Sequence, residues 1–149
     1  MKIKEIFWLI GTAIFALIII FLIFDLDSLS PGSTMDINIH DTYFIMPTSY
    51  FVVLLLILIF FGVYLIRMLR RNFKNKSANV IFLIVNILLV IKLTQTIYIL
   101  NAFAQSAENE TEMESGLMAF SNVLLTTQVF LLILLGFSGI KTGLNYKNK

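Results

Sequence analysis

The sequence predicts an all-α integral membrane protein with four transmembrane helices in an up-down-up-down bundle. Hydrophobic residues make up 58% of the 149 positions and charged residues only 13%, whereas soluble domains carry about 25% charged residues. The apolar residues also gather in four runs, each long enough to cross a hydrocarbon core of about 30 Å. The chain has no cysteine, which excludes disulfides, thiolate metal sites and cysteine nucleophiles.

The four predicted spans cover residues 6–24, 48–68, 79–101 and 117–139 of a single membrane domain, and the predicted loops cover residues 25–47, 69–78 and 102–116. The first span contains no charge. Pro47, just ahead of the second, suits the start of a helix. The third span is the most polar, and the fourth is apolar apart from its centre.

The distribution of basic residues predicts the orientation. Ten of the eleven lysine and arginine residues lie before the first span, around residues 69–78 or after the fourth span, and the loops 25–47 and 102–116 contain none. The positive-inside rule therefore predicts that both termini and residues 69–78 are cytoplasmic. We expect an integral protein of a bacterial inner membrane. Its net charge of +2 is too small to suggest a nucleic-acid partner, so the expected partner is the lipid bilayer.

An alternative interpretation takes the first span as a secretory signal. Lys2 and Lys4 precede an apolar stretch, and the segment 28–30 loosely resembles a small-residue cleavage site. Against it, the apolar run exceeds the usual 7–15 residues of a signal core. Its removal would leave three spans with the N-terminus outside.

The most informative motif lies between the first two spans, from Asp36 to Val52, and reads DINIHDTYFIMPTSYFV. This segment resembles the start of the tenth helix of haem–copper oxidase subunit I, with matches at Asp36, His40, Asp41, Thr42 and Tyr43. In that family two histidines that ligate haem follow on the same helix. Aligned without gaps, their positions are occupied by Thr48 and Tyr50.

The resemblance implies a protein without the family's haem and copper ligands, because His40 is the only histidine in the chain. Oxygen reduction by this chain alone is therefore excluded, and the resemblance implies a non-catalytic membrane protein associated with a respiratory oxidase. We expect no haem. A chain that kept one haem would have to use His40 with Met35 or Met46 as ligands.

The resemblance also implies one metal role. His40 and Asp41 match positions that bind magnesium between subunits I and II of the oxidases. Because magnesium prefers six oxygen ligands, a partner protein or Asp36 would have to complete the site. The alternative interpretation is that His40 and Asp41 cap the start of the second span.

Polar residues inside the third and fourth spans suggest another class of function. Lys92 lies near the middle of the third span, where a lysine costs about 2.5–3.5 kcal/mol, so it is a candidate for transport or proton relay. Alternatively, its side chain hydrogen-bonds to nearby polar groups and snorkels outward. Antiparallel packing predicts that the polar residues of the two spans pair across the helices as structural contacts. The alternative function is a small transporter or channel component that uses Lys92, Thr94, Gln95, Thr126 and Gln128.

Overall fold

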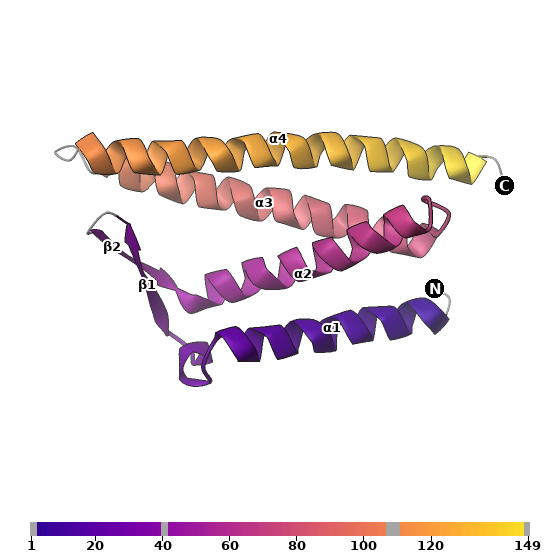
Figure 1. The fold of residues 1–149 in the computed structure, drawn as a ribbon, viewed down its shortest axis with the longest axis horizontal. Helices are drawn as coiled ribbons and strands as arrows, with labels where there is room; N and C mark the ends of the chain where they lie inside the picture. Colours follow the sequence, from indigo (N-terminus) through magenta and orange to yellow (C-terminus); the bar gives the residue numbers. More distant parts are fainter. Residues whose placement is uncertain (1–2, 40–41, 107–110, 148–149) are drawn as a thin grey trace.

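The computed structural model describes residues 3–39, 42–106 and 111–147. These residues form four α-helices and one β-hairpin (Figure 1). The elements in chain order are α1 (Ile3–Ile23), the 3₁₀ turn η1 (Asp27–Leu29), β1 (Thr34–Ile39), β2 (Thr42–Pro47), α2 (Thr48–Arg70), α3 (Lys76–Ser106) and α4 (Thr111–Lys147). Each of the four α-helices is long and apolar enough to cross a membrane, which confirms the four predicted helices.

Two helices extend beyond the predicted spans. α3 has 31 residues and α4 has 37, which correspond to about 46 and 55 Å of helix, more than the hydrocarbon core requires. The predicted loop at residues 102–116 is therefore partly helical. It contains acidic residues but no proline. Charge keeps a segment out of lipid but does not interrupt a helix, so the helices project past the apolar layer.

The segment that precedes α2 contains a β-hairpin that the sequence analysis did not anticipate. β1 and β2 pair antiparallel, in a register that runs from Thr34 opposite Pro47 to Ile39 opposite Thr42. Pro47 ends β2 because it has no N–H for the ladder, and its φ of −58° already suits the helix that follows. The backbone N–H of Thr48 donates to the carbonyl of Ser33 at 3.0 Å, which ties the start of α2 to the base of the hairpin.

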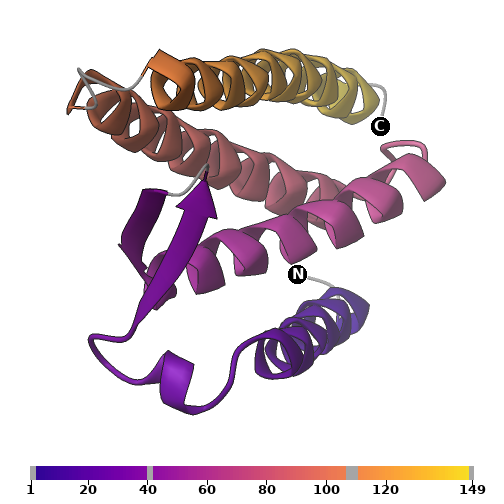
Figure 2. The same ribbon diagram turned by 60° about the vertical axis from the view of Figure 1, so that its left-hand side comes forward.

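The helices form an open row rather than a closed bundle. α1 packs on α2, α2 on α3 and α3 on α4 (Figures 1 and 2). Within the described residues, no extensive contact joins α1 to α4. The expected antiparallel packing of sequence neighbours is therefore present. The two outer helices each pack extensively on one partner only, and most of their apolar side chains are exposed on the surface of the chain.

The densest packing surrounds α3. One cluster of buried residues joins three helices and consists of Ile57, Val85, Leu89, Leu93 and Leu131. A second joins α2 to the start of α3 and consists of Tyr64, Met68, Ala78 and Phe82. α1 contributes Thr12, Ala16 and Ile20, which recur every four residues and so lie on one face. The small side chains of Thr12 and Ala16 suit close helix approach in a membrane.

The two ends of the row differ in composition. The N-terminus, the α2–α3 turn and the C-terminus lie at one end, and the hairpin lies at the other (Figure 1). We call these the basic end and the hairpin end. The described residues of the basic end include Lys4, Arg67, Arg70, Arg71, Lys74, Lys76, Lys141 and Lys147.

Candidate functional site

The best-defined polar site lies at the basic end and is built around the α2–α3 turn. The N–H of Asn72 donates to the carbonyl of Leu69 and the N–H of Phe73 to that of Met68, at 3.0 and 3.1 Å. This pair of bonds is a Schellman motif, which satisfies carbonyls that the helix end leaves free. Asn72 and Phe73 both have positive φ, 47° and 61°. The sharp reversal brings Asn75 and the start of α3 next to α1.

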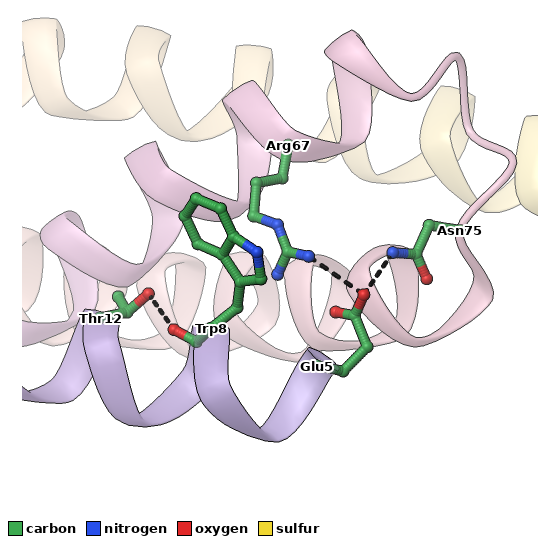
Figure 3. A network of polar contacts seen from close by, with 5 residues as sticks. All are labelled: Glu5, Trp8, Thr12, Arg67 and Asn75. Atoms are coloured by element: carbon green, nitrogen blue, oxygen red, sulfur yellow. Dashed lines mark hydrogen bonds and ion pairs between the residues drawn. The ribbon is translucent and has the colours of Figure 1, made fainter. Parts of the chain in front are cut away.

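Glu5 of α1 is the centre of this site (Figure 3). Its Oε1 accepts a hydrogen bond from Nη2 of Arg67 at 3.0 Å and another from Nδ2 of Asn75 at 2.6 Å. The side chains of Glu5 and Arg67 are only 7% and 11% exposed. One carboxylate therefore joins the first turn of α1 to the last turn of α2 and to the residue before α3.

Aromatic rings cover the Arg67 guanidinium. Its central carbon lies 4.5 Å from the ring centroid of Trp8 and 5.5 Å from that of Tyr64. Such cation–π contacts contribute about 0.5–2 kcal/mol, more where water is excluded. Glu5 Oε2 and Arg67 Nη1 are buried and form no hydrogen bond with the described residues. Because removing one member of a buried ion pair leaves an uncompensated charge, such a change typically costs about 3–5 kcal/mol.

The sequence analysis missed this cluster. The predicted first span begins at residue 6, which leaves Glu5 outside it, and Arg67 counts only as one of the basic charges that set the orientation. A signal was nevertheless present. Glu5 is the only acidic residue outside the two loops predicted to face outward, so it lies alone among cations at the basic end.

Lys92 of α3 faces α2. Its ammonium lies 5.0 Å from the centroid of the Tyr50 ring, and the Tyr50 hydroxyl shares a 2.6 Å hydrogen bond with the Thr96 hydroxyl. Tyr50 is the third residue of α2, about 3 Å along the axis from its start. The Lys92 ammonium therefore reaches the level at which α2 begins, which favours snorkelling over a charge held at the membrane centre.

The other predicted polar residues face elsewhere. Nε2 of Gln128 donates to the hydroxyl of Thr94 at 2.8 Å, which confirms the expected pairing across α3 and α4. Thr94 follows Lys92 by two residues, about 200° around the helix, so Lys92 faces α2 and Thr94 faces α4. Thr126 bonds the carbonyl of Asn122 in its own helix. Gln95 lines an open groove with Thr94 and several apolar residues. Lys92, Thr126 and Gln128 do not line this groove.

The two positions at which the resemblance places haem ligands are used in packing. The side chain of Thr48 is buried, with 1% exposure, and Tyr50 bonds to α3. His40 and Asp41, the predicted magnesium ligands, lie outside the described residues. Within the described ranges, no group of three or more histidine, aspartate or glutamate side chains is placed to hold a metal ion.

The chain matches no protein-family model, no curated protein and no solved structure.

The chemistry of the basic end is that of charge pairing. Glu5 and Arg67 neutralise each other, and Asn75 supplies a further donor to the carboxylate. Among the residues that the structure describes, the neighbouring cations Lys4 and Arg71 form no ion pair. The site fastens α1 to its neighbours and leaves an excess of positive charge around the junction.

Proposed function

We propose that the chain is a non-catalytic membrane protein that binds laterally to a haem–copper oxidase of the respiratory chain. The observation that carries lateral binding is the open row of helices, in which α1 and α4 each pack extensively on one neighbour. The resemblance of residues 36–52 to oxidase subunit I selects the class of partner.

The outer helices offer the contact surface. Phe7 and Leu22 of α1 are 69% and 77% exposed, and Phe130 and Ile133 of α4 are 63% and 65% exposed. In a bilayer such side chains meet either lipid tails or a neighbouring helix, and helix association then depends on close packing rather than on the hydrophobic effect. Long, mostly apolar faces at both edges of the row suit a protein that packs beside a larger membrane complex.

The surroundings of Thr48 and Tyr50 support a non-catalytic role. In the oxidases, the positions that align with Thr48 and Tyr50 are occupied by histidines. In this chain Thr48 is enclosed at the start of α2 and Tyr50 is bonded to Thr96 and stacked near Lys92. The two positions that the resemblance assigns to haem ligands lie about 200° apart on α2, where Tyr50 contacts α3 and Thr48 is buried.

We place the protein in a bacterial inner membrane, with the basic end in the cytoplasm. The gathering of the N-terminus, the α2–α3 turn and the C-terminus at one end supports this orientation, because the basic residues of three separate segments then lie on one side.

Site-directed cross-linking in native membranes tests the proposal, because the chain has no cysteine of its own. Leu22→Cys and Ile133→Cys place a thiol on each outer face, whereas Ala16→Cys and Ser138→Cys place one at positions with 0% exposure. We expect the first pair to give adducts containing oxidase subunits and haem absorption. The buried pair controls for non-specific capture. Adducts of the chain with itself alone, in membranes rich in oxidase, would contradict the proposal.

A further inference from the structure

A polar pocket of about 400 Å³ opens at the basic end, between the start of α1, the end of α2 and the start of α3. Its charged lining residues are Lys4, Glu5, Arg67, Arg71, Lys74 and Lys76. The pocket therefore contains five cations and one carboxylate. It lies where three apolar helices begin or end, which is the level of lipid headgroups for helices that cross a membrane.

The positive charge of the pocket is not balanced within the described part of the chain. Glu5 is already paired with Arg67, and this is the only ion pair found there. Lys76 lies over the ring of Tyr146, 3.7 Å from its centroid, a contact that supplies no negative charge. Four cations thus surround one cavity without a carboxylate partner. Because like charges repel, an anion in the cavity would lower their electrostatic energy.

An apolar groove of about 390 Å³ adjoins this pocket. It is lined by Phe7, Trp8, Gly11, Thr12 and Phe15 of α1 and by Val63 of α2. Trp8 lines both the groove and the pocket. From Phe7 to Phe15 the groove follows α1 for about 12 Å away from the basic end, so an apolar groove along the helices begins at the residue that also lines the cationic pocket.

We propose that the pocket and the groove together bind one anionic phospholipid. The phosphodiester lies among Lys4, Arg71, Lys74 and Lys76, and an acyl chain lies in the groove beside Trp8. A negative head joined to a hydrocarbon tail matches both parts of the site. A lipid whose headgroup also carries an ammonium would bring another cation into a pocket that already has an excess of them, so the site discriminates against it.

Gly11 allows the tail to be tested separately from the head. A Cβ at Gly11 would meet nothing within 4 Å, and Gly11 lines the groove, so Gly11→Leu adds a side chain to the space proposed for the tail. Gly136 of α4 has equally open surroundings, and Gly136→Leu is the matched control. For the headgroup, Lys4→Gln with Arg71→Gln removes two pocket charges. Lys141→Gln with Lys147→Gln removes two charges of the basic end that do not line the pocket.

The experiment is native mass spectrometry of the purified full chain with phosphatidylglycerol or phosphatidylethanolamine of identical acyl chains, and with inorganic phosphate as competitor. We expect preferential retention of phosphatidylglycerol. Each removed pocket charge should lower retention about fivefold, and the control pair should change it less than twofold. Gly11→Leu should lower retention of the lipid, and Gly136→Leu should not.

Three outcomes would overturn the inference. Equal retention of the two lipids would contradict the headgroup assignment. An equal loss of lipid from the two double variants, one inside and one outside the pocket, would contradict it as well. This comparison does not depend on whether Gly11→Leu folds. Complete displacement of the lipid by inorganic phosphate, together with full retention in Gly11→Leu, would mean that the pocket takes a free anion. None of these measurements depends on the oxidase.

Discussion

Asn79 and Asn145 donate side-chain hydrogen bonds to the same acceptor, the backbone carbonyl of Phe73, at 2.8 and 3.3 Å. Phe73 has a left-handed backbone conformation, which is costly for a bulky residue. Its ring also meets Phe137 edge-on, with 5.9 Å between the centroids. Contacts from α3 and α4 therefore hold the α2–α3 turn in shape, so α4 helps to fix a turn to which it is not connected.

These two bonds should differ in strength. Asn79 is fully buried and Asn145 is exposed, so water competes only for the second. We expect Asn79→Ala to lower the free energy of unfolding by about 1 kcal/mol, a typical value for one hydrogen bond. Asn145→Ala should cost less than half as much. Detergent-induced unfolding followed by circular dichroism measures both, and equal losses would contradict the assigned difference in burial.

The Glu5–Arg67 pair should dominate the attachment of α1. Glu5→Ala is expected to cost about 3 kcal/mol or more, because it leaves a buried guanidinium without its partner. Arg67→Met should cost a similar amount. The double variant should be less destabilised than the sum of the two by at least about 1 kcal/mol, since neither charge is then left alone. Strictly additive losses in the same unfolding assay would mean that the two groups do not interact.

Trp8 is the only tryptophan in the chain, and its ring lies under the Arg67 guanidinium. Its fluorescence should therefore report on this contact. We expect Arg67→Met to shift the emission maximum, because the cation and the packing around the indole change together. Arg70→Met, a neighbouring cation in the same helical turn, is the matched control. An unchanged spectrum in Arg67→Met would show that the ring does not sense Arg67.

The orientation can be tested by labelling single cysteines in intact cells with a membrane-impermeant thiol reagent. Ser30→Cys lies in the exposed segment between η1 and β1, and Lys147→Cys lies in the exposed last turn of α4. We expect the first to react in intact cells and the second only after permeabilisation. The reverse pattern would place the basic end outside. Labelling of both without permeabilisation would rule out opposite sides for the two segments.

The helices could be predicted because their signal is local. A run of about twenty mostly apolar residues has few alternatives in a membrane, and all four runs are helices. The hairpin also had a local signal, the alternation of Met35, Ile37 and Ile39 with polar residues, which is typical of a strand. The net acidity of this segment assigns it to one side of the membrane but says nothing about strand pairing, so the acidity alone predicts only a loop.

The candidate site could be predicted only in part because its contacts join distant segments. The bond between Thr94 and Gln128 could be predicted because the two residues lie at the same depth in antiparallel neighbouring helices. That depth can be estimated from the boundaries of the spans alone. The burial of Glu5 depends on how the α2–α3 turn presents Arg67 and Asn75. That geometry rests on two residues with positive φ, which spacing alone does not reveal.

The contacts of Glu5 have a consequence for the order in which the helices can be fixed during synthesis. Its partners Arg67 and Asn75 lie 62 and 70 residues further along the chain. At a synthesis rate of about 5–20 residues per second, the 62 residues from Glu5 to Arg67 take about 3–12 s, and only then can the carboxylate meet its first partner. During that interval Glu5 must be solvated by water or lipid headgroups, which holds the start of α1 at the membrane surface. The first helix of the row can therefore be fixed by Glu5 only after the end of α2 has been made.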